Sequence, residues 1–273
     1  MSLVLPDLAS ARDGVRWSVC VRAVDEAGAP VLASYTPEVV LRTASVGKVF
    51  LLVEVAARAE AGTLDLDEPI AWADAEHVAD SGLWYLLRQR TLPLGDLAWL
   101  VGAFSDNLAT NVLLRRAGTA AVRARATALG CVDSALLDRV RDDRGPGDPP
   151  TLSRGRADEL SAVLAGLARG EVVSPAVSAQ VLRWLAAGAD LSMVGSAFGL
   201  DPLAHADPDR GITLVNKTGT ISVVRADVGV VTGPARAVAY AALAEWPDGA
   251  DHRDAVLGSM RELGTTLRGH VGG

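Results

Sequence analysis

The sequence of 273 residues has little lysine, cysteine or aromatic residue, and it has neither a long apolar run nor a basic run. Its formal net charge is -7, so the electrostatic footprint of a nucleic-acid-binding protein is absent. No run of roughly 18 apolar residues predicts a membrane span. Residues 1–14 lack the pattern of a secretory signal. We therefore expect a cytoplasmic protein or the mature form of a secreted one, and the sequence leaves these two open.

Cysteine and histidine are too few and too scattered for a disulfide scaffold or a zinc site. Cys20 and Cys131 lie far apart in apolar surroundings, so we expect buried free thiols. The four histidines form no H-E-x-x-H motif and no pair at i, i+4. The sequence predicts no metal site and no cofactor.

Hydrophobic residues make up 49% of the chain, which is enough for a sizeable core. Apolar periodicity and turn residues predict strands at 15–23, 31–34, 211–216, 221–225 and 228–231, and helices at 46–61, 94–103, 106–117, 119–129, 156–169, 175–187 and 250–267. Strands at both ends that enclose a helical middle predict an α/β layer joined to an inserted all-α domain. We expect a discontinuous α/β domain of 1–44 and 205–273 and a helical domain of 45–204.

Lysine is the most informative scarcity. Of 26 basic residues, only Lys48 and Lys217 are lysines. Arg stays protonated in proteins, whereas a desolvated Lys can act as a base, so an Arg-biased chain is expected to keep Lys where it titrates or where a compact ammonium is needed. A GC-rich coding sequence explains the count of Arg but not the positions of the two lysines.

Lys48 lies three residues after Ser45, at the start of a predicted buried helix. The hydroxyl and the amine then share a face of the helix, and a desolvated Lys can activate the Ser as a nucleophile. The helix N-terminus also favours a developing oxyanion. Alone, the pattern is more typical of a capping Ser followed by a solvated Lys.

Ser105, Asp106 and Asn107 stand just before another predicted helix. All three are favoured N-cap residues, which is a sufficient structural explanation of the motif alone. The functional alternative gives Ser105 a proton relay to the leaving nitrogen and Asn107 a substrate amide, while Asp106 braces the turn.

Lys217, Thr218, Gly219 and Thr220 end the predicted strand that begins near residue 211. Lys217 and Thr218 can bind a substrate carboxylate, and Gly219 allows a close approach of the backbone. The Thr220 N–H can join the Ser45 N–H in an oxyanion hole. A polar end of an edge strand is the structural alternative.

The order S-x-x-K, S-D-N and K-T-G resembles the signature of class A β-lactamases and penicillin-binding proteins. Segments 62–69 and 108–111 also resemble this family, and the resemblance covers nearly the whole chain. It implies the class A β-lactamase-like (serine β-lactamase/D,D-peptidase) fold, which is an antiparallel sheet with flanking helices plus the inserted all-α domain, with a site between the domains. It also implies acylation of Ser45 by a β-lactam or a peptidoglycan-like small molecule, and we expect a monomer.

The chain departs from the family in one loop. Leu137, Asp138 and Arg139 resemble the entry to the omega loop, but Arg141 stands where the family has a deacylating glutamate. Asp142 and Asp143 are open as replacements. We therefore predict a class A-like serine β-lactamase with slow deacylation. A D-Ala-D-Ala peptidase or esterase with the same residues and a non-hydrolysing penicillin-binding protein are the alternatives.

Two further assignments rest on the resemblance alone. Arg225, on the strand after K-T-G, is the candidate for a second group that binds the substrate carboxylate. Trp84 and Tyr85 are candidates for an aromatic side chain at the mouth of the cleft, with packing as an equal alternative for both.

Overall fold

A computed structural model of the protein describes residues 3–8, 14–205 and 207–272. The prediction that residues 1–14 lack the pattern of a secretory signal falls partly on residues 1–2 and 9–13, which lie outside this description. No helix within the described residues is long and apolar enough to cross a membrane. Cys20 and Cys131 are buried free thiols, as predicted.

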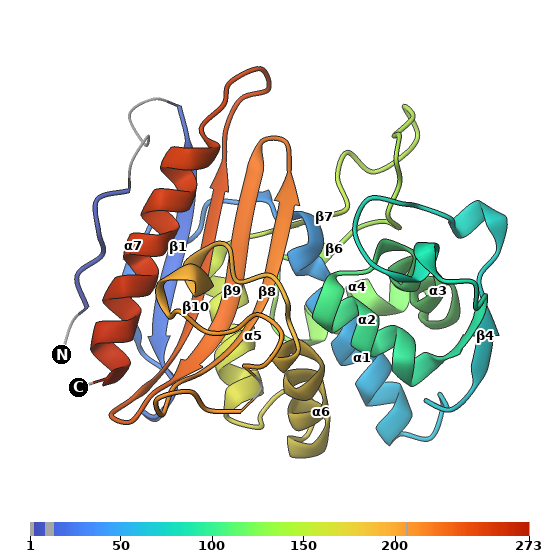
Figure 1. The fold of residues 1–273 in the computed structure, drawn as a ribbon, viewed down its shortest axis with the longest axis horizontal. Helices are drawn as coiled ribbons and strands as arrows, with labels where there is room; N and C mark the ends of the chain where they lie inside the picture. The colour runs from blue at the N-terminus through green and yellow to red at the C-terminus, as the bar shows by residue number, and fades with distance from the viewer. Residues whose placement is uncertain (1–2, 9–13, 206, 273) are drawn as a thin grey trace.

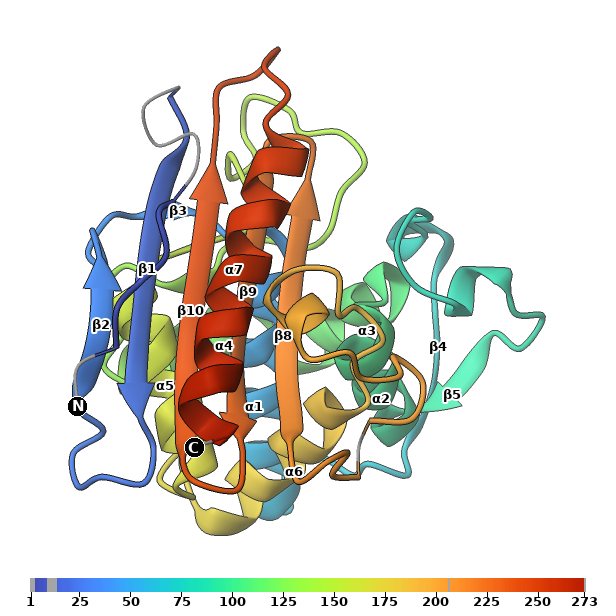
Figure 2. The same cartoon turned by 60° about the vertical axis from the view of Figure 1, so that its left-hand side comes forward.

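Five strands form one antiparallel sheet with the spatial order β2-β1-β10-β9-β8. The strands are β1 (Arg16–Ala23), β2 (Val31–Tyr35), β8 (Thr213–Ile221), β9 (Val224–Thr232) and β10 (Ala237–Glu245). Helix α5 (Ala157–Ala168) and helix α7 (Arg253–Gly272) cover opposite faces of this sheet (Figures 1 and 2). The predicted antiparallel sheet with flanking helices is confirmed.

A helical part packs beside β8, the edge strand of the sheet (Figure 1). It contains α1 (Lys48–Glu60), α2 (Leu94–Phe104), α3 (Asn107–Ala117), α4 (Thr119–Ala128) and α6 (Pro175–Ala186). The central helix is α1, which contacts the other four and is buried over its first ten residues, 48–57. Its wide apolar face therefore predicts its position correctly.

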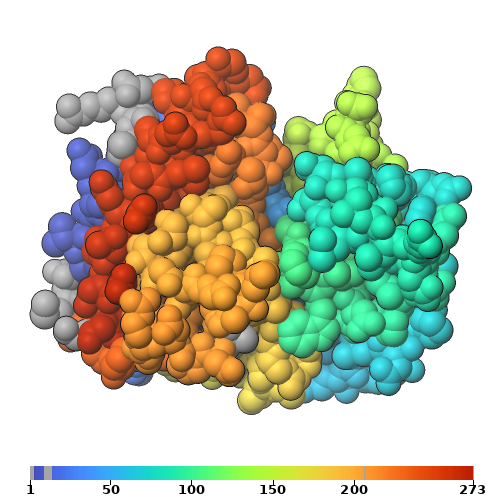
Figure 3. All heavy atoms as spheres, in the orientation of Figure 1, coloured from blue at the N-terminus to red at the C-terminus, as the bar shows by residue number. Residues whose placement is uncertain are grey.

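The remaining elements are short. They are the three-stranded sheet of β3 (Leu41–Arg42), β7 (Ser153–Gly155) and β6 (Ala135–Leu136), the pair β4 (Pro69–Ala71) and β5 (Thr91–Pro93), and the 3-10 turns η2 (Ala44–Gly47), η3 (Asp74–Glu76), η4 (Trp84–Leu86) and η5 (Val194–Ala197). The surface is hollowed between the orange strands and the green segments of the helical part (Figure 3).

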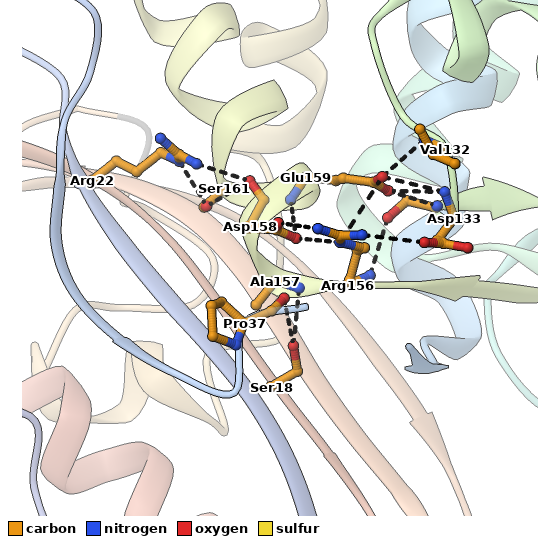
Figure 4. Close-up of polar contacts among 11 residues, drawn as sticks. Ser18, Arg22, Pro37, Val132, Asp133, Arg156, Ala157, Asp158, Glu159 and Ser161 are labelled. Atoms are coloured by element: carbon orange, nitrogen blue, oxygen red, sulfur yellow. Dashed lines mark hydrogen bonds and ion pairs between the residues drawn. The ribbon is translucent and has the colours of Figure 1, made fainter. Parts of the chain in front are cut away.

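The first turn of α5 fastens the sheet to the segment that leads into the loop at 137–151 (Figure 4). The Ala157 N–H donates to Ser18 Oγ on β1, at 3.0 Å. The Glu159 carboxylate accepts the backbone N–H groups of residues 132, 133 and 134, at 2.8 to 3.3 Å. Helix α5 thus connects the sheet to residues 132–134, which precede the loop. The division into 1–44 with 205–273 and 45–204 stays a prediction, and α5, inside the second range, packs on β1, β9 and β10.

Candidate active site

Ser45 lies in the tight turn η2 directly before α1, not inside the helix. The preceding residue, Ala44, has a φ of +46°, a conformation that L-residues other than Asn and Asp adopt rarely. Ser153 holds this turn, because its Oγ donates to Ala44 O at 2.5 Å and lies 2.7 Å from Thr43 Oγ1. Gly47 is required here, since a Cβ would lie 2.4 Å from Ser153 Cβ. The turn leaves the Ser45 side chain facing a cavity.

Lys48 begins α1 and is fully buried. Its Nζ donates to Ser105 O at 2.5 Å and to Asn107 Oδ1 at 2.8 Å, and it lies 3.4 Å from Ser105 Oγ. None of the ion pairs within the described residues includes Lys48. Burial, and then the charge of Lys217, lower the pKa of Lys48 well below its ordinary value. The amine is therefore chemically suited to accept a proton.

The Ser105-Asp106-Asn107 segment both caps a helix and faces Lys48. Asp106 is the N-cap of α3, as its structural explanation predicted, and its Oδ1 accepts from Ala109 N at 2.8 Å. Its Oδ2 accepts the N–H groups of Leu83 and Trp84, at 2.7 and 2.8 Å. The expected brace is thus present. It fixes the turn that holds Ser105 and Asn107 on either side of the Lys48 ammonium.

The K-T-G-T segment lies at the cavity end of β8, where the strand meets η2. A Cβ on Gly219 would lie 2.2 Å from Thr43 O and 3.0 Å from Ser45 N, so only glycine fits the contact. The Ser45 N–H is thereby placed beside the residue that precedes Thr220. Lys217 is buried, and its Nζ donates to Thr218 O at 2.9 Å. Burial lowers its pKa to about 8, although Asp190 and Asp227 oppose the shift.

The cavity between the sheet edge and the helical part has a volume of about 920 Å³. Its lining includes six of the nine predicted site residues, Ser45, Ser105, Asn107, Lys217, Thr218 and Thr220. Lys48 contacts Ser105 and Asn107 from beneath, and Gly219 packs against Ser45 N. The structure thus brings together eight of the nine residues that the sequence singled out.

Arg225 is the predicted site residue that the structure does not bring to the cavity. Its guanidinium donates to Ile221 O and Val224 O, at 2.7 and 2.8 Å, and lies 5.8 Å from the ring centroid of Trp246. It is not among the described residues that line the cavity. The sequence predicted the correct strand for Arg225, but its guanidinium binds backbone carbonyls at the β8–β9 turn.

The two aromatic residues considered for the cleft mouth are also outside the lining. Trp84 is fully buried and donates from Nε1 to Gln89 O at 2.8 Å. Tyr85 packs edge-on against His77, with ring centroids 6.5 Å apart. The packing alternative therefore describes both residues, and Val78, Asp80 and Ser81 line the cavity instead.

The loop at 137–151 forms one wall of the cavity and is held by charges. The nearly buried Asp138 carboxylate accepts from Arg141 Nε at 2.7 Å and from Arg144 Nη1 at 2.5 Å. Arg141 Nη2 also pairs with Asp148, at 3.0 Å. The hydrogen bonds that Arg141 donates to Asp138 raise the pKa of its guanidinium above the ordinary value, and the charges of Asp138 and Asp148 add to this shift, while burial opposes it.

Asn111 fixes the register of this loop. Its side chain accepts from Val140 N at 2.8 Å and donates to Val140 O at 3.0 Å, which clamps the residue before Arg141. Arg141 and Asp142 line the cavity, and among the described residues Asp143 does not. Asn111 follows Asn107 by one helical turn, in the segment 108–111 that resembles the family. This resemblance was the signal in the sequence that could have pointed to Asn111.

Asp190 lines the cavity beside Lys217 and Thr218, and no sequence pattern predicted it. It follows α6 in a segment that matches no motif. Within the described part of the chain, no group of three or more His, Cys, Asp or Glu side chains could hold a metal ion.

Comparison with known proteins gives a consistent result for the family and the fold. The family model described as "Beta-lactamase enzyme family" matches residues 4–270. A comparison with curated protein sequences finds no significant match.

Several solved structures resemble the chain over nearly its whole length. The β-lactamase from Sphaerobacter thermophilus DSM 20745 has a TM-score of 0.82 and 24% identity, covering 97% of this chain and 94% of that chain. A mutant of PBP-A in an acyl-enzyme complex with penicillin G has a TM-score of 0.80 and 21% identity, covering 96% and 92%. An ancestral class A β-lactamase has a TM-score of 0.78 and 23% identity, covering 95% of each chain.

Proposed function

The chain belongs to the beta-lactamase enzyme family, and from this membership we propose that it opens β-lactam rings through an acyl-enzyme on Ser45 and deacylates slowly. At the coarser level it is a β-lactamase-like serine hydrolase with the class A fold. The observation that carries the finer proposal is the arrangement around Lys48, a buried amine held by two oxygen acceptors.

A neutral lysine amine has two N–H bonds and one lone pair. Ser105 O and Asn107 Oδ1 accept the two N–H bonds, which leaves the lone pair to take the Ser45 hydroxyl proton. Ser45 Oγ then forms a bond to the β-lactam carbonyl carbon, and the C–N bond of the ring breaks. Ser105 Oγ, 3.4 Å from Lys48 Nζ, passes a proton from Lys48 to the leaving nitrogen.

The remaining groups stabilise charge. The Ser45 and Thr220 N–H groups bind the oxyanion that develops on the carbonyl oxygen. Lys217, a cation below a pKa of about 8, and Thr218 bind the substrate carboxylate. Asn107 retains its Nδ2 for a substrate amide, with a long 3.5 Å contact to Ala79 O as its protein partner.

The loop at 137–151 supports deacylation less well than the surroundings of Lys48 support acylation. Arg141 keeps its proton, so it cannot accept one from an attacking water. Asp142 is the loop carboxylate that lines the cavity within the described residues, and it is exposed to solvent. This supports a slow second step, and it favours the D-Ala-D-Ala peptidase or esterase and the non-hydrolysing penicillin-binding protein as the alternatives.

Intact-mass spectrometry with benzylpenicillin tests the proposal. Ring opening loses no atoms, so we expect a mass increase equal to the whole antibiotic, and Ser45→Ala should abolish it. Ser222→Ala, at an exposed serine outside the cavity lining, is the matched control and should acylate normally. An adduct that persists in Ser45→Ala would refute the assignment of the nucleophile.

The lifetime of the adduct separates the three functions. A transient adduct with hydrolysed product identifies a β-lactamase, and a stable adduct identifies a penicillin-binding protein. The absence of any adduct points to a peptidase or esterase acting on another acyl donor.

A further inference from the structure

An acidic side chain lies where the cavity is expected to bind an anion. Asp190 lines the cavity, in the segment after α6. Its backbone is fixed, because Asn216 Nδ2 donates to Asp190 O at 3.2 Å and the preceding Ala189 N–H donates to Ala103 O at 2.9 Å. Its Oδ1 accepts from the N–H and the hydroxyl of Ser192, at 3.0 and 2.6 Å. The carboxylate is therefore held in one place.

Asp190 also interacts with both residues of the expected anion site. Burial would raise the pKa of its carboxyl, but hydrogen bonds from Ser192 and Thr218 and the charge of Lys217 outweigh burial and lower the pKa. In the other direction, Asp190 supports the protonated form of Lys217. At neutral pH this end of the cavity thus contains one ammonium, one hydroxyl and one fixed carboxylate.

On the basis of the proposed function, we infer that Asp190 determines specificity by acting as an internal anion on Lys217 and Thr218. Its charge competes with a substrate carboxylate for these two residues and repels that carboxylate. The enzyme then prefers acyl donors that are neutral at this position, such as amides or esters, over those with a free carboxylate. Discrimination arises from a repulsive element in the site, a common route to specificity.

The opposite role is physically possible and makes the inference testable. If Asp190 served mainly to keep Lys217 protonated, its removal would weaken the binding of carboxylates. If it competes with them, its removal strengthens their binding. In both cases the binding of neutral ligands should stay the same, because they carry no charge that interacts with Lys217 or Asp190.

The experiment compares benzylpenicillin with its methyl ester, which differ in this one charge. For Asp190→Asn we expect the second-order acylation rate for benzylpenicillin to rise about tenfold, as expected when a like charge is removed from a partly solvated site. The rate for the ester should stay within about twofold. Asn retains an oxygen for the Ser192 N–H, so the local structure is conserved. Asp143→Asn is the matched control, since it removes an exposed carboxylate outside the cavity lining.

A loss for benzylpenicillin, or an equal gain for both ligands, would overturn the inference. If the wild-type protein forms no adduct, the proposed function is refuted, but the inference about Asp190 can still be tested. Equilibrium binding of both ligands to Ser45→Ala and to Ser45→Ala/Asp190→Asn tests Asp190 without acylation. In that assay, stronger binding of benzylpenicillin without a change for the ester supports the inference. Any other result, including no binding of either ligand, contradicts it.

Discussion

The two lysines are both buried, but their amines have different surroundings. Lys48 Nζ has two oxygen acceptors within 2.8 Å. Burial lowers the pKa of both amines and two carboxylates oppose each shift, but the charge of Lys217 adds to the shift of Lys48, whose pKa lies well below its ordinary value, while that of Lys217 is about 8. This difference assigns Lys48 to proton transfer and Lys217 to charge, and each assignment can be tested by an Arg substitution.

Lys48→Arg should lose acylation far more than a conservative exchange suggests. A guanidinium keeps its proton, so the general-base contribution of about 10²- to 10⁴-fold should be lost. The wider head group must also fit where Lys48 Nζ now contacts Ser105 O. The measurement is the acylation rate with a chromogenic β-lactam, with Lys217→Arg as the comparison. Equal losses in the two variants would contradict the division of roles.

Lys217 predicts the alkaline limit of acylation by a carboxylate-bearing β-lactam. Its ammonium is present below the pKa of about 8 and is lost as the pH rises through that value. We therefore expect the acylation rate for benzylpenicillin to fall above about pH 8 and Lys217→Arg to move this fall to higher pH, because Arg stays charged. A fall at the same pH in both proteins would assign it to another group.

At the scale of elements, the loop at 137–151 decides the balance between the two chemical steps. Arg141 is not free in the cavity wall but is paired with Asp138 and Asp148. A glutamate at this position would gain a base and lose both pairs, bringing a third carboxylate to the cluster. The sequence alone identified Arg141 as the residue that replaces the family's glutamate. The structure shows in addition that Arg141→Glu would break two ion pairs.

Wild-type protein should show a burst of β-lactam hydrolysis followed by a low steady rate. Arg141→Glu should raise the steady rate by less than the roughly 10²- to 10⁴-fold of a well-placed base, and Arg141→Glu/Asp148→Asn should raise it further by removing one repulsion. The burst rate should change little in both. Fast wild-type turnover without a burst would show that another group already serves as base, and Asp142→Asn would then identify Asp142.

The same scale shows where sequence patterns succeed and fail. Helices with a wide apolar face or a clear cap, such as α1 and α3, lie within a few residues of their predicted ranges. Strand β10 was missed because its alanines have low strand propensity, although burial between β1 and β9 favours small side chains. The polar run at 217–220 broke the strand pattern, so β8 and β9 were predicted as three pieces instead of two.

The candidate site residues were easier to predict than the strands of the sheet, because the chemistry proposed for each motif allows few residue types. Ser45, Lys48 and Lys217 were identified by motif and by the scarcity of lysine. The position of Asp190 depends on contacts with residues distant in sequence, such as Asn216, which no local pattern encodes. The ion pairs of Arg141 and the carbonyl partners of Arg225 are close in sequence, but they form in irregular turns whose geometry no motif specifies.

At the scale of the whole molecule, the site exists only where the sheet and the helical part meet. Strand β8 supplies Lys217 to Thr220, and η2 with α1 supplies Ser45 and Lys48. Gly219 packs directly against the backbone across this junction, where a Cβ would lie 2.2 Å from Thr43 O. This backbone contact cannot be relieved by moving a side chain.

Gly219→Ala should therefore separate β8 from η2 and misplace the Thr220 N–H relative to the Ser45 N–H. Loss of one oxyanion donor typically costs about 10²- to 10³-fold in rate, so we expect acylation to fall by about that factor. The forced contact should also lower the thermal midpoint. Gly258→Ala in α7 is the matched control, because its Cβ would meet nothing within 4 Å, and Ala favours a helix by about 1 kcal/mol over Gly. That variant should be as stable as wild type or more stable and should acylate normally. Acylation by Gly219→Ala at the wild-type rate would show that the junction tolerates a side chain and that the Thr220 N–H does not bind the oxyanion.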